Sequence, residues 1–180
     1  MIFSFSGVKQ SYKKILIVGG IGAGKTTLAK KLSRMLKIKH YELDNLMYKR
    51  RDIHERQKPK IRDEKVKRIL KREKWIVEGF YSRYWTYPFY KKADIVIILN
   101  FKTSVSKNRL IRRFVKRKLS FGKRRDVNQS FKRMLSLINY IDEYPKKYFS
   151  MQKETAKEFN KNVLILENNK QINDFLGTLK

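Results

Sequence analysis

The sequence contains no cysteine, and its longest apolar runs are short. Without cysteine the chain can form neither a disulfide nor a thiolate metal site and has no cysteine nucleophile, which suits a reducing cytoplasm. The runs Ile15–Val18 and Ile95–Leu99 fall far below the roughly 18 residues that a membrane span needs. The apolar start, Met1–Val8, is too short for the core of a signal peptide, and no basic residue precedes it. We therefore expect a soluble, cytoplasmic protein with no membrane partner.

Acidic residues are also scarce, because 16 Asp and Glu stand against 45 Lys and Arg, and the formal net charge is +29. Such a charge attracts polyanions, so nucleotides, nucleic acids and anionic lipid surfaces are candidate partners. Drift of the composition towards Lys, Ile and Tyr would produce the same excess with no partner at all. A hydrophobic fraction of 41% nevertheless indicates a folding chain, and a length of 180 residues suits one domain spanning 1–180.

Five apolar segments predict β-strands, and patterns typical of helices separate them. The strands are expected at 15–18, 38–43, 75–77, 94–99 and 163–166. Helices are expected at 25–36, from 61 up to Trp75, and at 105–119, 127–141 and 172–176, with Pro145 kinking or ending the fourth. This alternation predicts an α/β fold in which helices cover both faces of a parallel sheet. Ligands bind such sheets outside the carboxyl ends of the strands.

One motif carries most of the functional information: Gly19-Gly20-Ile21-Gly22-Ala23-Gly24-Lys25-Thr26 matches the phosphate-binding pattern G-x-x-x-x-G-K-[ST]. Glycines let successive backbone N–H groups face phosphate oxygens, and the following helix adds the positive end of its dipole. A chance glycine-rich turn would lack the predicted strand before it and the predicted helix after it. We expect ATP and Mg²⁺ as cofactors, with Lys25 acting catalytically on the β- and γ-phosphates and Thr26 as a metal ligand. The residues expected to bind the nucleotide are Gly19, Gly20, Ile21, Gly22, Ala23, Gly24, Lys25, Thr26 and Thr27.

Two acidic residues follow predicted strands and are candidates for chemistry. Asp44 comes after the second strand, where a carboxylate can accept the proton of an attacking hydroxyl or orient the acceptor. The alternative role of Asp44 is that of a helix N-cap. Glu78 ends the third strand, where an acid could hold Mg²⁺ through water or bind an acceptor group. The alternative for Glu78 is an exposed charge at the end of a strand.

A basic segment follows the fourth strand, because Lys107–Arg125 contains ten basic residues and no acid. We expect a lid at about 109–128, in which Gly122 permits movement. Arg109 and Arg113 lie four residues apart on one helical face, and arginines on a closing segment can stabilise the charge of a transferred phosphoryl group. We assign catalytic roles to both arginines and a nucleotide contact to Arg109. For 116–118 and 123–125 a solvated helix face is the better interpretation.

The phosphate loop, Leu43-Asp44, the block Trp75–Ser82 (W-I-V-E-G-F-Y-S) and the strand start Ala93-Asp94 follow one another in a recognisable order. They resemble the small P-loop kinases described as DNA topology modulation (FlaR-like) proteins, which are relatives of adenylate and shikimate kinases. The resemblance covers most of the chain from Lys14 onward. It implies a three-layer P-loop NTPase fold of the nucleotide-kinase type, with five parallel strands in the order 2-3-1-4-5. It does not name the phosphoryl acceptor.

The chain departs from adenylate kinases in the region expected to bind the acceptor. Those enzymes carry an acid-Gly-Phe-Pro-Arg block, where this sequence has Glu78 followed by Gly-Phe-Tyr-Ser-Arg, and this difference argues against AMP as the acceptor. The segment at about 45–74, expected to form an acceptor-binding insertion, is short and very basic. The aromatic residues between Phe80 and Tyr90 either line an acceptor pocket or belong to the core. His40 and His54 are interpreted as structural.

Two hypotheses about function follow. The first is an adenylate-kinase-like phosphotransferase that moves the γ-phosphoryl group of Mg·ATP to a small molecule or a nucleotide. The alternative is a nucleic-acid-directed protein, either a polynucleotide 5′-hydroxyl kinase or a nucleotide-dependent DNA-binding protein that modulates topology. The charge of +29 and the aromatic cluster favour the alternative, whereas the phosphate loop with its acidic neighbours favours the first.

Overall fold

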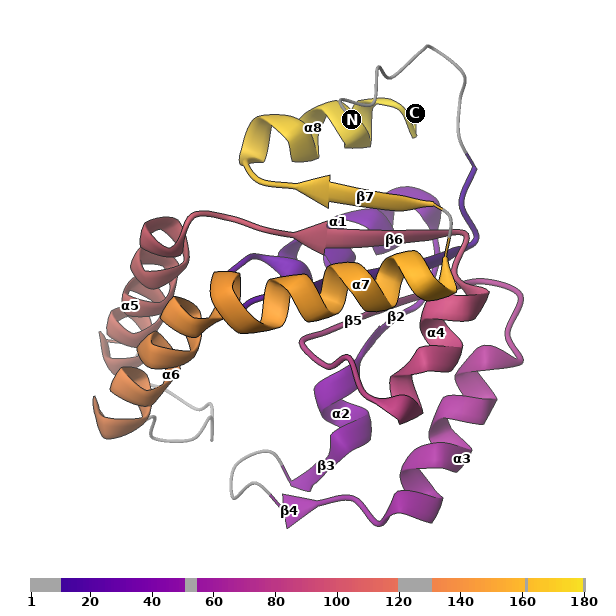
Figure 1. Ribbon diagram of the computed structural model, residues 1–180, viewed down its shortest axis with the longest axis horizontal. Coiled ribbons are helices and arrows are strands. Elements are labelled where there is room, and N and C mark those ends of the chain that lie inside the picture. Colours follow the sequence, from indigo (N-terminus) through magenta and orange to yellow (C-terminus); the bar gives the residue numbers. More distant parts are fainter. Residues whose placement is uncertain (1–10, 51–54, 120–130, 161, 180) are drawn as a thin grey trace.

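A five-stranded parallel sheet forms the centre of the protein, and helices cover both of its faces (Figure 1). The computed structural model describes residues 11–50, 55–119, 131–160 and 162–179, with the side chains of 50, 117–119 and 131–133 left out. Residues 120–128 of the predicted lid, and His54, therefore lie outside the described part of the chain.

The strands of the sheet lie in the order β2-β5-β1-β6-β7. Counted along the chain among themselves, they run 2-3-1-4-5. The predicted strand order and the α/β fold class are therefore confirmed. The bounds are β1 (Lys14–Gly19), β2 (His40–Glu42), β5 (Trp75–Gly79), β6 (Ile95–Leu99) and β7 (Val163–Leu166).

The central strands are buried on both sides, as their continuous apolar sequences predict. Ile15 and Ile17 of β1 pack on one face, against α1 (Lys25–Leu36) and α8 (Asn169–Gly177). Leu16 and Val18 pack on the other face, against α2 (Leu43–Met47), α3 (Pro59–Leu70), α4 (Tyr87–Lys92) and α7 (Phe149–Phe159). In Figure 1, α7 crosses in front of the strands and α1 lies behind them.

The register of the strands brings their carboxyl ends to one edge of the sheet. Val18 lies opposite Gly79 on β5, and Gly19 lies opposite Leu99 on β6. On the next strand pair, Glu42 lies opposite Glu78. The phosphate loop after β1 and both predicted acidic positions therefore meet at the same level.

Helices α5 (Thr103–Leu119) and α6 (Phe131–Glu143) lie beyond this edge, and α7 returns along the sheet (Figure 1). Helices α5 and α6 pack together through Leu110, Met134 and Ile141. The α-helix ends at Glu143, and a π-helical turn, η2 (Tyr144–Tyr148), leads into α7. Pro145 lacks the N–H for the usual helical hydrogen bond, which accounts for the predicted end of α6.

Helix α7 itself was not predicted from the sequence. Its buried residues are Gln152, Thr155 and Ala156, so polar residues interrupt the apolar face that Ala156 forms with the partly buried Phe149 and Phe159. The predicted insertion contains α2, α3 and a small hairpin of β3 (Tyr48–Arg50) and β4 (Glu55–Arg56) that sequence reasoning also missed. A short 3₁₀ helix, η1 (Tyr84–Thr86), precedes α4. Within the described ranges, no helix has both the length and the apolar character needed to cross a bilayer.

Asp94 fixes the start of the central strands and gives a test of the fold. Its Oδ2 accepts hydrogen bonds from the backbone N–H groups of Lys13 (2.7 Å) and Lys14 (2.8 Å). We expect Asp94→Ala to lower the free energy of unfolding by about 1–2 kcal/mol, because two backbone donors lose a charged acceptor. Asp174→Ala removes only an exposed helical pair with Lys170 and is expected to cost less than about 0.5 kcal/mol. Urea unfolding of both variants measures the difference, and equal losses would contradict it.

Candidate functional site

The phosphate loop takes a conformation that its glycines make possible. Gly22 and Gly24 have φ values of +75° and +98°, and Gly24 is the N-cap of α1. A Cβ atom on Gly22 would lie 2.5 Å from the carbonyl oxygen of Ser106 at the start of α5. The loop is therefore held against α5 by backbone contact that leaves no room for a side chain.

Lys25 is half-buried at the centre of the site. Its Nζ donates a hydrogen bond to the carbonyl oxygen of Gly20, 2.7 Å away. Burial lowers the pKa of Lys25, the negative charges of Glu78 and Asp44 act to raise that pKa, and the positive charge of Arg113 lowers it further. The structure thus brings four of the predicted site residues within electrostatic reach of one another.

Thr26 and Glu78 are in direct contact. The Thr26 hydroxyl donates a 2.6 Å hydrogen bond to Oε1 of Glu78, although the two residues are 52 positions apart in the sequence. Burial would raise the pKa of Glu78, but His40, Lys25 and Thr26 together outweigh it and lower the pKa below its ordinary value. Glu78 is therefore a buried carboxylate that stays charged at neutral pH. The alternative of an exposed charge at the strand end is wrong, because Glu78 is 4% exposed.

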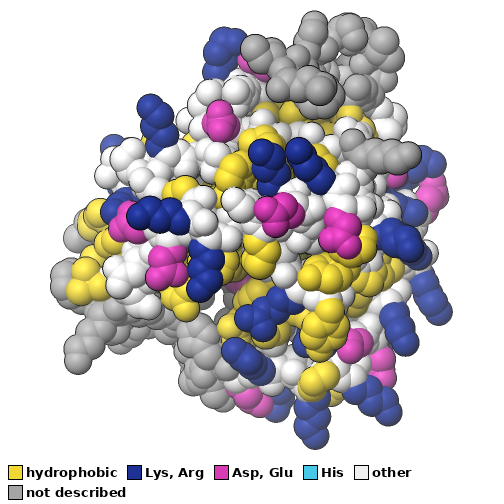
Figure 2. Space-filling view, in the orientation of Figure 1, with side chains coloured by type: hydrophobic (Ala, Val, Ile, Leu, Met, Phe, Trp, Pro, Cys, Tyr) yellow, Lys and Arg dark blue, Asp and Glu magenta, His cyan; other side chains and the backbone are white. Residues whose placement is uncertain are grey.

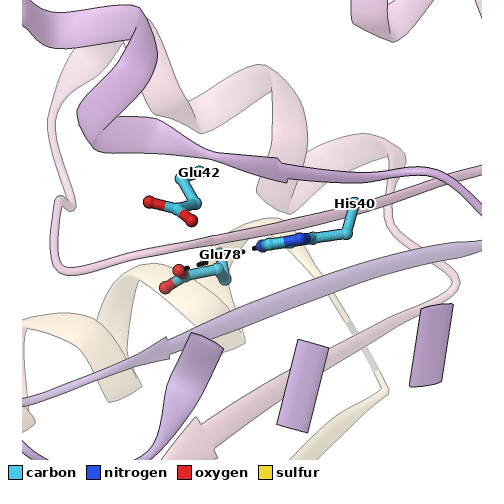
Figure 3. Close-up of side chains that lie close together, drawn as sticks. All are labelled: His40, Glu42 and Glu78. Carbon is cyan, nitrogen blue, oxygen red and sulfur yellow. Dashed lines mark ion pairs between the residues drawn. The ribbon is translucent and has the colours of Figure 1, made fainter. Parts of the chain in front are cut away.

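His40 and Glu42 join Glu78 in a group that could hold a cation. One ligand atom from each of the three residues lies within 4.8 Å of the other two, and Figure 3 shows the three side chains converging from neighbouring strands. His40 Nε2 is buried without a hydrogen-bond partner, 4.0 Å from Oε1 of Glu78. Mg²⁺ prefers oxygen ligands, so the carboxylates of Glu42 and Glu78 and the hydroxyl of Thr26 fit the predicted metal. His40 adds a nitrogen donor to the group.

Asp44 lies in the first turn of α2, directly after β2, and is not the N-cap, a position held by Glu42. Tyr81 makes side-chain hydrogen bonds with Asp44 and Tyr48. Burial, and then the negative charge of Asp44, raise the pKa of Tyr81, so its hydroxyl remains a donor to the carboxylate. Gly79 allows the start of α2 to lie close to β5, because a Cβ atom on Gly79 would lie 2.7 Å from Cβ of Leu43.

The two predicted lid arginines have different surroundings. Arg109 donates to the carbonyl oxygen of Ala23 (2.9 Å) and to Oδ1 of Asn169 (2.9 Å). Its guanidinium lies 4.4 Å from the ring centre of Phe101. Arg109 therefore stabilises the phosphate loop through its hydrogen bond to Ala23. Arg113 lies about one helical turn further along α5, and its positive charge lowers the pKa of Lys25.

The aromatic cluster divides between the core and the site. Trp85, Phe89 and Tyr90 are buried in the core. Phe80 and Tyr81 directly follow β5, and Tyr81 lies beside Asp44. Sequence reasoning missed the ring contacts of Phe80 with Tyr144 and Tyr148, and the contact of Tyr148 with Tyr140. The spacing of four residues between these three tyrosines was a visible signal. It also missed His40, whose position two residues before Glu42 on a strand was the available clue.

Positive charge is spread over the surface that Figure 2 shows. On this face the Lys and Arg side chains lie across its whole extent, with acidic side chains among them. Some basic residues are tied to acidic partners, such as Lys107, whose Nζ lies 2.7 Å from Oδ1 of Asp142 on α6. Among the residues that the structure describes, this face therefore carries no continuous basic stripe.

Comparison with known proteins agrees with this geometry. A family model described as an AAA domain matches residues 15–132. No curated protein matches the sequence. Similar solved structures include a shikimate kinase from Bacteroides thetaiotaomicron, which is 17% identical, with 94% of this chain and 97% of that chain covered and a TM-score of 0.55. A shikimate kinase from Acinetobacter baumannii in complex with shikimate is 14% identical, with 92% of each chain covered and a TM-score of 0.52.

A gluconokinase from Sinorhizobium meliloti 1021 has the same fold, with 13% identity, 93% of this chain and 89% of that chain covered, and a TM-score of 0.51. At these identities the likeness establishes the fold, which is that of small P-loop kinases.

Gly22 offers a direct test of the phosphate loop. We expect Gly22→Ala to weaken binding of Mg·ATP by about tenfold or more, because the positive φ and the contact with Ser106 strain any side chain there. Gly177→Ala is the matched control, since a Cβ atom at this end of α8 meets nothing within 4 Å. Titration calorimetry gives the two affinities. Equal affinity in both variants would show that the loop does not hold the phosphates.

Proposed function

This chain belongs to the AAA-domain family, whose model matches residues 15–132, and we propose that it is a P-loop phosphotransferase. It transfers the γ-phosphoryl group of Mg·ATP to a hydroxyl group of a small molecule or nucleotide. The observation that carries this proposal is that Asp44, Glu78 and Arg113 lie within electrostatic reach of Lys25 in the phosphate loop, where Glu78 also accepts a hydrogen bond from Thr26. That arrangement supplies groups for the donor phosphates, the metal and the acceptor in one place.

In the proposed reaction the acceptor oxygen forms a bond to the γ-phosphorus, and the bond from that phosphorus to the β,γ-bridging oxygen breaks. ADP leaves, and the proton of the acceptor hydroxyl passes to the carboxylate of Asp44. Tyr81 holds Asp44 in place through its hydroxyl. Lys25 and Arg113 stabilise the negative charge on the γ-phosphoryl oxygens, and Arg109 keeps the loop in shape from outside.

Mg²⁺, when bound, neutralises the β- and γ-phosphate oxygens. Thr26 and Glu78 are the residues that would hold it, Glu78 through water, and the 2.6 Å hydrogen bond between them supports this assignment. The lowered pKa of Glu78 keeps the carboxylate charged for that purpose.

The acceptor is proposed to bind beside Asp44, on the side of α2 and the insertion at about 45–74. The fold neighbours are named for acceptors with hydroxyl groups, shikimate and gluconate, which supports transfer to an alcohol oxygen. The resemblance to adenylate kinases and to FlaR-like topology modulation proteins keeps a nucleotide among the candidate acceptors, although the block after Glu78 argues against AMP. Asp44 serves either kind of acceptor, because a sugar acid and a nucleotide both present a hydroxyl group to the γ-phosphorus.

Lys25 and Asp44 provide the central test. We expect Lys25→Ala to lower kcat by about 10²-fold or more through lost charge stabilisation, and Asp44→Asn to lower it by about 10²- to 10⁴-fold through the lost base. The measurement is formation of ADP and of phosphorylated product with a panel of nucleosides, nucleotides, sugars and hydroxy acids.

Asp174→Asn on the exposed face of α8 serves as the matched control and is expected to keep wild-type turnover. If both site variants turn over every acceptor as fast as the wild type does, the proposed roles are wrong.

A second candidate, action on nucleic acid, is supported by the net charge of +29. Binding that depends on charge alone falls steeply with salt, because each phosphate contact releases counterions. We expect binding to a single-stranded oligonucleotide to be lost by about 0.15 M salt, since basic and acidic side chains are interspersed on the face in Figure 2. A fluorescence anisotropy titration at several salt concentrations measures this. Binding that survives that salt concentration, with ATP turnover that rises on adding the oligonucleotide, would favour the second candidate.

A further inference from the structure

Four aromatic side chains stand together next to the site, and we refer to them as the aromatic wall: Phe80, Tyr140, Tyr144 and Tyr148. The ring centres of Phe80 and Tyr148 are 4.9 Å apart, and those of Phe80 and Tyr144 are 6.3 Å apart. Tyr140 extends the wall, with its ring centre 6.4 Å from that of Tyr148. Phe80 directly follows β5, whereas the three tyrosines lie at intervals of four residues in α6 and η2.

The wall is fixed to the site from behind. Tyr144 is buried, and its hydroxyl donates to Oε1 of Gln152 (2.8 Å), while Nε2 of Gln152 donates to the carbonyl oxygen of Phe80 (2.6 Å). The ring of Tyr144 also packs on the phosphate loop, because a Cβ atom on Gly20 would lie 3.0 Å from it. The position of the wall is therefore set by the same loop that binds the donor phosphates.

The outer rings of the wall remain accessible to a ligand. Tyr140 is 44% exposed, and Phe80 and Tyr148 are half-buried. Tyr81 continues the aromatic surface towards Asp44, with its ring centre 6.3 Å from that of Phe80. An acceptor whose hydroxyl reaches Asp44 would thus have aromatic ring faces beside the rest of its structure.

We propose that the acceptor is a nucleoside unit, with its sugar hydroxyl at Asp44 and its base stacked on the aromatic wall. This inference rests on the proposed phosphotransferase function and names the substrate class for it. Aromatic rings bind any nucleobase through its π-face, whereas a sugar acid offers no planar ring to stack. The sugar oxygen gains the phosphoryl group, ADP leaves and Asp44 takes the hydroxyl proton, so the base takes no part in bond making. A free nucleoside and the 5′-terminal nucleoside of a strand present the same chemistry.

The test compares acceptors that share a sugar and differ in the base. Adenosine and cytidine are compared with methyl β-D-ribofuranoside, which keeps the ribose hydroxyls but lacks a base. We expect kcat/KM to be about 5- to 100-fold higher for the nucleosides, the range that corresponds to stacking of one base on aromatic side chains. A 5′-hydroxyl oligonucleotide is run alongside to separate a free nucleoside from a strand end, and preference for either supports the proposal.

Variants of Tyr140 link the preference to the wall. Tyr140→Ala is expected to remove most of the nucleoside advantage by raising KM, with little effect on kcat, and Tyr140→Phe is expected to restore it. The base-free acceptor should be unaffected by either change. Tyr84→Ala, at a residue that is 68% exposed and lies outside the wall, is the matched control.

Two results would overturn the proposal. One is a kcat/KM for methyl β-D-ribofuranoside, for shikimate or for gluconate that equals the kcat/KM for the nucleosides. The other is an equal loss for all acceptors in Tyr140→Ala, which would indicate a structural role. Failure of the phosphotransferase function itself shows differently, as absence of ADP formation with every acceptor. In that case binding of adenosine against methyl β-D-ribofuranoside, followed by tyrosine fluorescence of the ATP-saturated protein, still tests the wall, and equal affinities would overturn it.

Discussion

The parallel register of β2, β5 and β1 is the constraint on which the rest of the site depends. It places Glu42 opposite Glu78, and Gly79 opposite Val18, so three strands end at the same level. The phosphate loop, the carboxylate of Glu78 and the helix that carries Asp44 all follow from those ends. Because a shift of one residue would turn each side chain to the other face of the sheet, register and site cannot be separated.

Much of the fold could be predicted from the sequence, because its signals are local. Continuous β-branched runs such as Ile15–Val18 identify strands buried on both faces, and the phosphate loop fixes the first turn after them. The elements that were missed have weak local signals. The buried Gln152 and Thr155 interrupt the apolar face of helix α7, and the β3–β4 hairpin is short and bulged.

Residues of the candidate site were easiest to predict where one sequence motif contains them. Lys25 and Thr26 belong to such a motif, and Glu78 stood out among few acids. Contacts across the sequence were harder. A spacing of four residues puts Arg109 and Arg113 on one face of α5, but it also separates the two residues by about 6 Å along the helix axis. That displacement is enough to place one arginine outside the phosphate loop and the other near Lys25.

The glycines of the site also limit where its chemistry can change in evolution. Gly22 and Gly79 have no space for even a methyl group, because the backbone of Ser106 and the side chain of Leu43 already occupy it. Larger residues are therefore not tolerated at these two glycine positions. The exposed side of the aromatic wall at Tyr140 has no such restriction. Under the function and acceptor site proposed above, a lineage built on this fold would therefore acquire a new substrate by exchanging residues of α6 and η2, while its phosphate chemistry stayed the same.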